Sequence, residues 1–523
     1  MPDSPSTTRK LGLAAAIFIA AVLLSRVLGF ARDAFVAAAF GANGATDAFY
    51  AAFTLPDVLN YLVAGGTLSI TFIPIYTRHL TSGDEREGNR VFSIIATTML
   101  LVLVAGVIAL EVWTPELAGR YLKKLQPKDL QLAIELTRIL LPAQICFYLG
   151  GLASATLMAR HKFVAAAMAP LAYNAGTIAG GALLGRQLGA ASLAWGTLAG
   201  ALVGPFAIQM VAAWRAGLRY LPSLRVRHAE FREWLWLSLP LMIGVSLVTF
   251  DDWIIRYFAA GDVGAISCLS YARKLVLVPI AVAGQAVGQA SMPFFARLHA
   301  ENKQDELARL VMRSARASAS IAALAAAAMI ALATPLTDLL FRRGHFSVEQ
   351  VAPTARYLAI YAVAIPLWGM QGILARAFYA ARDTLTPMVA GTVITIASLP
   401  IYWSMFHALG VNGLVISSGI GILLHTAALL ALLPRRLPSA DRLGLITGIA
   451  RALVLGAAGG AAAWAVARFL PIGNLHGHAL QLVRAGAGGA VFLAVTLLLM
   501  RPLGVEDVQS LFDRVLGRIF RRR

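Results

Sequence analysis

Charged side chains inside long apolar stretches are the residues of this sequence best placed to do chemistry. Arg26, Arg32 and Asp33 interrupt the first apolar run, and Asp47 stands at the start of the second. A charge that faces lipid near the centre of a membrane helix costs at least about 2.5–3.5 kcal/mol, so such residues usually line a wet cavity or pair with one another. Asp47 could instead cap a helix near the outer membrane surface.

A second group of charges lies in the middle of the chain. Asp251, Asp252 and Arg256 fall in one apolar run, and Arg273 and Lys274 fall in the next. Asp252 and Arg256 are four residues apart, on one face of a helix, so they are a candidate structural ion pair. Arg26 and Asp33, seven residues apart on one helix face, could pair in part, whereas Arg32, Arg273 and Lys274 have no obvious local partner of opposite charge in the sequence. This surplus of cations predicts a cavity that holds an anion, and a phosphate or pyrophosphate suits arginine best.

Common catalytic and metal-binding motifs are missing from the sequence. There is no G-x-x-x-x-G-K-[ST] loop for nucleotide hydrolysis and no H-E-x-x-H, and the nine histidines are scattered. Cys146 and Cys268 lie in apolar stretches and show no metal-ligand spacing. We therefore expect no enzyme, no cofactor and no metal site.

The composition indicates a polytopic membrane protein. Of the 523 residues, 59% are hydrophobic and 14% are charged, whereas soluble domains have roughly 45–50% and about 25%. The mean hydropathy is +0.72. A soluble nucleic-acid-binding protein with a net charge of +19 would need many more charged residues, so we expect no nucleic-acid partner.

About 14 membrane-spanning helices are predicted from stretches of roughly 20 apolar residues. The first follows Arg9 and Lys10 without a clear cleavage site, and we interpret it as an uncleaved membrane helix rather than a secretory signal. Proline residues predict kinks in the two longest spans. The predicted spans are 11–38, 48–77, 91–112, 131–158, 163–185, 189–213, 234–259, 265–296, 310–332, 352–380, 386–407, 411–433, 447–469 and 481–500.

Basic residues cluster in every second loop, which places those loops and both chain ends in the cytosol. The spans then group into an N-terminal lobe of six helices, a cytosolic linker, a C-terminal lobe of six helices, two further helices and a basic tail. The tail either lies on an anionic membrane surface as an amphipathic helix or is solvated and serves only topology. In order, these predicted parts are 1–214, 215–233, 234–434, 435–500 and 501–523.

A weak internal repeat links the two lobes. Residues 44–55 resemble residues 264–275, about 220 positions later, and each segment opens the second helix of its half. An even number of helices between the copies makes the repeat parallel, related by an axis along the membrane normal. The repeat therefore predicts an all-α bundle of membrane helices whose two halves form a parallel pseudo-repeat.

Several segments closely resemble the MviN/MurJ family of lipid II flippases. The resemblance extends from about residue 20 to residue 430, and its first and last segments are the most specific. The segments are Ser25–Asp33 (SRVLGFARD), Phe40–Phe49, Leu55-Pro56, Ala169–Asn174, Gly264–Ser267, Tyr271-Ala272, Met292-Pro293, Leu340–Phe346 and Phe378–Pro387 (FYAARDTLTP).

This resemblance implies a 14-helix transporter of the multidrug/oligosaccharidyl-lipid/polysaccharide exporter superfamily. Its two six-helix lobes would surround a central cationic cavity, and the last two helices would form a lipid-facing groove. The implied substrate is lipid II, the undecaprenyl-pyrophosphate-linked precursor of peptidoglycan. Alternating access would move it from the inner to the outer leaflet.

The resemblance also assigns roles to residues. Family arginines of the first helix match Arg26 and Arg32, and a family aspartate matches Asp47. A family arginine falls on Asn60, where the charge is lost, and another falls on Lys274, which keeps the charge without the bidentate fork of arginine. The predicted substrate-binding residues are Arg26, Arg32, Asp47, Asn60, Arg273 and Lys274.

The function predicted from the sequence is thus lipid II flipping for cell-wall synthesis and cell shape. We expect a monomer in the bacterial inner membrane that works beside the cell-wall synthesis machinery. An exporter of another polyprenyl-linked oligosaccharide is the main alternative. A cation-coupled drug exporter would need carboxylates in the cavity, whereas the unpaired charges here are mostly basic. A membrane-embedded polymerase would need an acidic residue near a sizeable outer loop, and only loops 113–130 and 334–351 have some length.

Overall fold

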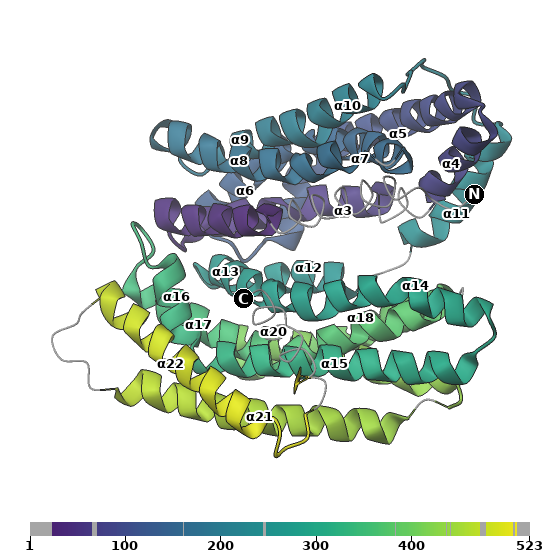
Figure 1. Ribbon diagram of the computed structural model, residues 1–523. Coiled ribbons are helices and arrows are strands. Elements are labelled where there is room, and N and C mark those ends of the chain that lie inside the picture. Colours follow the sequence, from purple (N-terminus) through teal and green to yellow (C-terminus); the bar gives the residue numbers. More distant parts are fainter. Residues whose placement is uncertain are drawn as a thin grey trace, which may run out of the picture. The chain divides into compact units, whose positions relative to one another are not determined.

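The computed structural model describes most of the chain, and the described part consists of helices joined by short connections (Figure 1). No β-strand occurs in this part, which confirms the predicted all-α class. The start of the first predicted span and most of the predicted basic tail, including residues 510–523, lie outside the described residues. The described residues are 24–64, 71–160, 162–243, 247–381, 383–435, 437–439, 441–470, 477–505 and 508–509.

The helices form two compact units. Unit 1 comprises the described residues of Met1–Gly244 and Ala260–Ser267, and unit 2 those of Val245–Ala259 and Cys268–Arg523. One helix, α13 (Ala265–Ile280), therefore begins in unit 1 and continues in unit 2. The domain boundaries proposed from the sequence stay a prediction.

Unit 1 begins with a helix over residues 24–40. Helix α2 follows after a short turn in which Asn43 caps its N-terminus. Pro205 lies within a π-helical segment, η2, where the wider turn interrupts the regular hydrogen-bond pattern. The remaining elements are α2 (Gly44–Ala52), α3 (Thr54–Ala64), α4 (Ile73–Ser82), α5 (Glu85–Tyr121), α6 (Pro127–Leu140), α7 (Ala143–Ala159), α8 (Phe163–Leu188), α9 (Ala191–Ala201), η2 (Leu202–Ile208), α10 (Gln209–Arg215) and α11 (Ala229–Ile243).

Unit 2 contains the helices from α12 onward. A second π-helical segment, η3, follows directly after Pro279, where the sequence predicts a kink. The elements are α12 (Leu247–Ala259), α13, η3 (Ala281–Ala286), α14 (Val287–Ala300), α15 (Gln304–Ala331), α16 (Ala333–Phe341), α17 (Val348–Val363), α18 (Ile365–Ala380), α19 (Leu385–Leu409), α20 (Val411–Leu432), η4 (Leu433–Arg435), α21 (Arg442–Phe469) and α22 (Gly477–Leu499).

Many of these helices suit a membrane. Among the described residues, eight continuous helical runs are long and apolar enough to span a bilayer. A ninth span arises if α17 and α18, which meet at 41°, are counted together. The predicted total of 14 stays a prediction, since several predicted spans are broken into shorter helices or run into residues outside the description.

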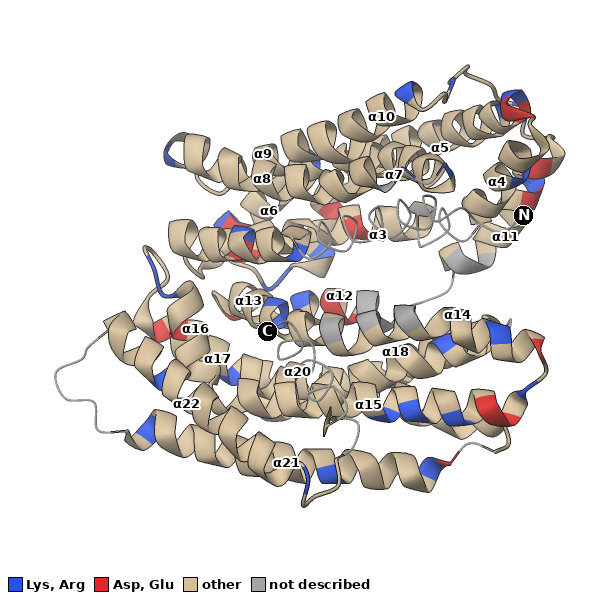
Figure 2. Ribbon diagram, in the orientation of Figure 1, with Lys and Arg blue, Asp and Glu red and all other residues tan. Residues whose placement is uncertain are grey.

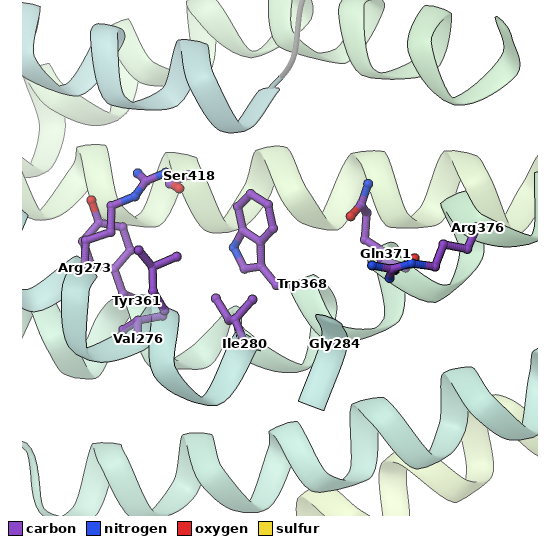
Figure 3. A pocket seen from close by; sticks show the side chains of 11 residues that line it. Arg273, Val276, Ile280, Gly284, Tyr361, Trp368, Gln371, Arg376 and Ser418 are labelled. Atoms are coloured by element: carbon purple, nitrogen blue, oxygen red, sulfur yellow. Dashed lines mark hydrogen bonds between the residues drawn. The ribbon is translucent and has the colours of Figure 1, made fainter. Parts of the chain in front are cut away.

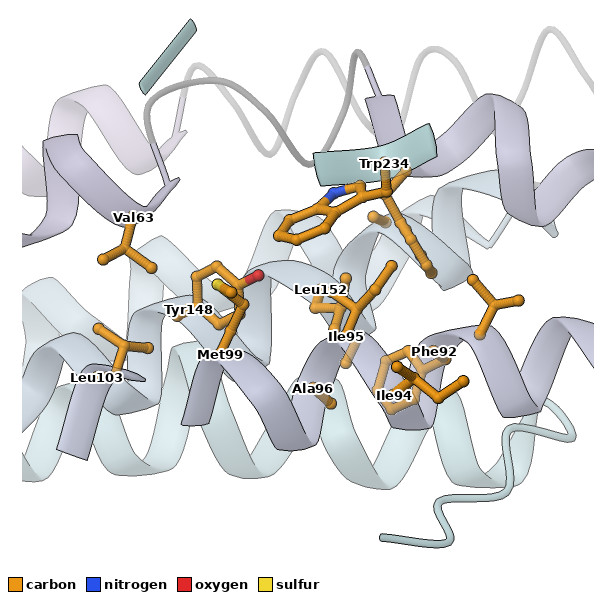
Figure 4. Close-up of a cluster of buried hydrophobic side chains, with 14 of the residues drawn as sticks. Val63, Phe92, Ile94, Ile95, Ala96, Met99, Leu103, Tyr148, Leu152 and Trp234 are labelled. Carbon is orange, nitrogen blue, oxygen red and sulfur yellow. The ribbon is translucent and has the colours of Figure 1, made fainter. Parts of the chain in front are cut away.

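Two kinds of packing hold unit 1 together. A buried cluster joins α5, α7 and α11: Trp234 of α11 lies among Phe92 and Ile95 of α5 and Tyr148 and Leu152 of α7 (Figure 4). Helices α8 and α9 instead approach through small residues, because lipid provides no hydrophobic force that drives helices together.

The approach of α8 to α9 depends on pairs of glycines spaced four apart. A Cβ atom added to Gly176 would lie 2.5 Å from the Cα of Gly200, and one added to Gly180 would lie 2.5 Å from the Cα of Gly196. Such distances exclude any side chain, so the two backbones pack in direct contact. This rigid pair of helices supports the first helix, where Phe35 lies 2.7 Å from the Cβ position of Gly181.

Candidate functional site

Arg32 and Asp33 form an ion pair on the first helix. The Nη2 of Arg32 lies 2.9 Å from Oδ1 of Asp33, and its Nε donates to the same oxygen at 3.0 Å. The Asp33 side chain is buried, and the hydroxyl of Tyr50 on α2 donates to it at 3.4 Å. Arg26, one and a half turns earlier on this helix, is exposed. The expectation that Arg32 has no local partner is therefore wrong: the carboxylate of Asp33, the next residue, holds its guanidinium in place.

Asp47 joins α2 to the start of α13. Its Oδ2 accepts the backbone N–H of Gly264 at 2.5 Å, and its Oδ1 accepts the N–H and the hydroxyl of Ser267 at 2.8 and 2.6 Å. The carboxylate is 1% exposed. Backbone N–H groups at the start of a helix lack partners within it, and a carboxylate is a strong acceptor for them. Asp47 thus caps the start of α13, a helix other than the one that carries it.

The connection before α13 needs a glycine at position 264. Gly264 has φ of +82°, and a Cβ atom there would lie 2.7 Å from the carbonyl oxygen of Ala42. Both the backbone conformation and the close approach require glycine. This explains why the segment Gly264–Ser267 combines a glycine with a serine that binds Asp47.

Arg273 of α13 has partners that the sequence does not suggest. Its guanidinium contacts the carboxylate of Asp251 and lies 3.0 Å from Oδ1 of Asp252, both on α12. Asp251 is 1% exposed and also accepts the hydroxyls of Tyr402 on α19 and Ser418 on α20. Four helices of unit 2 therefore meet at one buried carboxylate, and Arg273 balances its charge.

Asp252, the predicted ion-pair partner of Arg256, contacts Arg273. Asp252 keeps 43% of its side chain exposed while it contacts Arg273. The pair with Arg256 stays a prediction. Lys274 follows Arg273 on α13 and is half-buried. Because consecutive residues of an α-helix are rotated by about 100°, its side chain leaves the helix in a different direction from that of Arg273.

Arg273 lines a cavity of about 230 Å³ inside unit 2. Figure 3 shows Arg273 at one end, Trp368 near the middle and Arg376 at the other end. The polar and aromatic lining residues are Arg273, Tyr361, Trp368, Gln371, Arg376 and Ser418.

Arg376 is a site residue that the sequence analysis missed. It lies on α18, lines the cavity and donates to the carbonyl oxygen of Gly372 at 3.0 Å. The sequence does indicate this residue, because Arg376 is a charge inside the apolar run 352–380, just as Arg32 is a charge inside the first apolar run. Its guanidinium, the amide of Gln371 and the indole N–H of Trp368 are donors that suit a phosphate or a sugar.

The other predicted residues are spread over both units. Asn60 lies on α3 and is half-buried, and Arg26, Arg32 and Asp47 share unit 1 with it. Arg273 and Lys274 belong to unit 2. Arg273 and Arg376 line opposite ends of one cavity in unit 2, whereas Asp47 caps the start of a helix in unit 1.

Sequence comparisons connect this arrangement to known proteins. Residues 36–483 match the family model described as lipid II flippase MurJ. The chain is 30% identical over 459 residues to the probable lipid II flippase MurJ of Rhizobium meliloti (strain 1021), covering 86% of this chain and 85% of that protein. It is 30% identical over 428 residues to the lipid II flippase MurJ of Burkholderia cenocepacia, covering 79% and 82%.

Solved structures show the same fold. A lipid II flippase MurJ in an inward closed conformation superimposes with a TM-score of 0.76 at 19% identity, covering 93% of this chain and 99% of that one. An inward-facing multidrug resistance MATE family transporter of the MOP superfamily gives 0.62 at 14% identity, covering 84% and 98%. Fold and sequence therefore agree on a multi-pass membrane transporter. The chain belongs to the MurJ family of lipid II flippases.

Proposed function

We propose that this protein flips lipid II, the lipid-linked precursor of peptidoglycan, from the inner to the outer leaflet of the bacterial cytoplasmic membrane. The family to which the chain belongs supports this substrate. The observation that carries the proposal is the placement of guanidinium groups among apolar helices: Arg32 on the first helix, and Arg273 and Arg376 in the unit 2 cavity. A pyrophosphate headgroup needs such donors when it leaves water.

The fold supports movement by alternating access. MATE family transporters with inward-facing and outward-facing conformations share it. No nucleotide-binding loop occurs in the sequence, so the reaction is transport rather than catalysis in this proposal. The protein would act as a monomer that passes its substrate to the cell-wall synthesis machinery.

We further propose the orientation in the membrane. Basic residues lie at or beside three connections: Arg78, Arg86 and Arg90 flank the turn between α4 and α5, Arg219, Arg225 and Arg227 lie between α10 and α11, and Arg297, Lys303 and Arg309 lie in or beside the turn between α14 and α15. The positive-inside rule favours the cytosol for these segments and for both chain ends.

The predicted site residues then take different roles. Arg26 and Arg32 would bind the pyrophosphate from unit 1, Lys274 would add a point charge, and Asn60 would offer a neutral hydrogen bond. Asp47 would act as a positioning residue, because both of its carboxylate oxygens accept hydrogen bonds from backbone N–H groups at the start of α13.

Complementation of a bacterium depleted of its own lipid II flippase tests the proposal. We expect the wild-type chain to restore growth, and we expect Arg32→Ala and Arg26→Ala to fail although they insert normally. Arg186→Ala, which removes an exposed arginine at the end of α8, is the matched control and should behave as wild type.

Failure of the well-expressed, inserted wild-type chain to restore growth would contradict the assignment of lipid II. It would favour export of another polyprenyl-linked oligosaccharide, an alternative supported by Asn60 and Lys274 at positions where the family resemblance implies arginine. An in vitro flipping assay with both lipid classes would then identify the headgroup.

A further inference from the structure

Two histidines and two glutamates from separate segments meet in unit 1. His79 lies on α4, Glu87 in the first turn of α5, His228 just before α11 and Glu230 in the first turn of α11. The Nε2 of His79 is 2.7 Å from Oε1 of Glu230, and the Nε2 of His228 is 2.8 Å from Oε1 of Glu87. Acidic and basic residues gather near α4 and α11 in Figure 2.

The two histidine–glutamate pairs form one cluster. One ligand atom each from Glu87, His228 and Glu230 lies within 4.8 Å of the other two. His79 adds a fourth side chain, and the second imidazole, through its contact with Glu230. These four side chains are 13–25% exposed, so the cluster is shielded but still reachable from solvent.

Two atoms of the cluster are not used by the fold. Oε2 of Glu230 and Nδ1 of His228 are buried and have no hydrogen-bond partner. A buried acceptor without a partner is costly, and such atoms mark places where an ion or water can be held. The cluster therefore has more ligand capacity than its two hydrogen bonds require.

We propose that this cluster binds one Zn²⁺ ion. Imidazole nitrogen and carboxylate oxygen are zinc ligands, and zinc binds four of them in a tetrahedron at about 2.0–2.2 Å. Ligand atoms at the corners of such a tetrahedron are about 3.3–3.6 Å apart. The present separations of 2.7 and 2.8 Å would have to increase by about 0.5–0.9 Å, which side-chain rotations allow.

The charges of the cluster and the hydrogen bonds to its side chains also favour Zn²⁺. The two carboxylates neutralise a divalent cation, and both imidazoles coordinate when neutral. Arg90 donates to Oε2 of Glu87 at 2.9 Å, which leaves Oε1 directed to the cluster. Hydrogen bonds of this kind orient the ligands of metal sites.

A bound ion would tie the segment before α11 to the α4–α5 turn. This segment already contacts α5, since the N–H of Leu221 donates to Ser93 Oγ at 3.1 Å and that of Ser223 to Thr97 Oγ1 at 3.2 Å. The segments that form the site carry none of the residues assigned to lipid II, so the site adds to the proposed transport function and does not depend on it.

Metal analysis of the purified full-length protein tests the proposal. Protein stripped with a chelator is dialysed against Zn²⁺, and competition with a chromophoric chelator measures the affinity. We expect the wild type to bind one Zn²⁺ per chain. Glu230→Gln or His228→Gln should lower the affinity more than about 100-fold, because loss of a residue that only hydrogen-bonds to a metal ligand already costs about 10- to 100-fold. His345→Gln and Glu349→Gln change exposed residues of the same types elsewhere and should bind as wild type.

A second readout reports the position of the ion. Arg225 and Arg227 are exposed and lie just before His228, so trypsin cleavage there should slow when Zn²⁺ is added to wild-type protein but not when it is added to the variants. Co²⁺ in place of Zn²⁺ should give the visible absorption of a tetrahedral site in the wild type, which tests the site even if a variant fails to fold. Absence of stoichiometric zinc in the wild type, or equal zinc binding by wild type and both variants, would overturn the proposal and leave two hydrogen-bonded histidine–glutamate pairs.

Discussion

Asp47 and Arg376 are both ionisable residues in apolar helices, but their surroundings differ. Asp47 is buried and accepts three hydrogen bonds at the start of α13. Arg376 lines an open cavity and donates to a single backbone carbonyl of its own helix. The first arrangement stabilises the fold, whereas in the second only one guanidinium hydrogen bond is formed with the described residues, which leaves donor capacity for a ligand.

Replacement of Asp47 should therefore reduce stability. Asp47→Ala leaves two buried N–H groups without acceptors, and we expect a loss of about 3 kcal/mol, because hydrogen bonds to charged groups contribute about 1.5–3 kcal/mol each. Asp47→Asn should lose less, since its amide oxygen can still accept from Ser267 while its NH2 opposes the N–H of Gly264. Thermal unfolding in detergent measures the effect.

Asp262→Ala is the control for this series. Asp262 is exposed in the turn before α13, and its replacement should change stability by no more than about 0.5 kcal/mol. Equal stability of Asp47→Ala and Asp262→Ala would show that the contacts of Asp47 do not stabilise α13.

Replacement of Arg376 should reduce transport with little effect on stability. Arg376→Gln removes a charged donor from the cavity, and we expect transport to fall by about 10- to 100-fold, the equivalent of one hydrogen bond to a charged group. Arg376→Lys should retain part of the activity because it keeps the charge but not the planar fork. A lipid flipping assay in proteoliposomes measures both, with Arg343→Gln on the exposed α16–α17 connection as the control. Wild-type transport by Arg376→Gln would exclude a substrate contact at this residue.

At the scale of elements, the glycine faces of α8 and α9 control how closely two helices approach. Figure 1 shows the two helices side by side. Gly180 lies against the backbone of Gly196, so even a methyl group cannot be accommodated without moving a helix. The first helix packs on the same pair and carries Arg32, which makes this contact part of the support of the candidate site.

Gly180→Leu should consequently disrupt unit 1. We expect a loss of about 3 kcal/mol or more, since overpacking by single methylene groups already costs about 1–3 kcal/mol and here the obstacle is backbone. Gly486→Leu on α22 is the matched control, because nothing lies within 4 Å of its Cβ position. Monodisperse elution and thermal unfolding of the purified variants compare them, and equal behaviour would contradict direct backbone contact between α8 and α9.

At the scale of the whole molecule, the proposed orientation can be tested by labelling. Arg225 lies in the segment proposed to face the cytosol, and Lys123 lies in the connection between α5 and α6, which this orientation places outside; both are exposed. This connection is shorter than the loop 113–130 expected from the sequence, because α5 extends to Tyr121. With Cys146 and Cys268 replaced by serine, Arg225→Cys should react with a membrane-impermeant maleimide only after permeabilisation. Lys123→Cys should react in intact cells, because the positive-inside rule places it outside. The reverse pattern would invert the proposed topology.

Composition and hydropathy alone determined that this chain is an all-helical membrane protein, since the free energy of moving apolar residues from water into lipid adds up along the sequence. The same reasoning found Arg26, Arg32 and Arg273, and it could have found Arg376, because each interrupts an apolar run. Local motifs were enough to indicate the family.

Only the tertiary structure decided which charges pair with which. Asp47 binds Ser267, 220 residues away, and Asp251 meets Tyr402, 151 residues away. The cluster around His79 and Glu230 likewise joins residues 151 positions apart. Such partners depend on how the faces of separate helices pack, and no property that is read along a single helix contains that information.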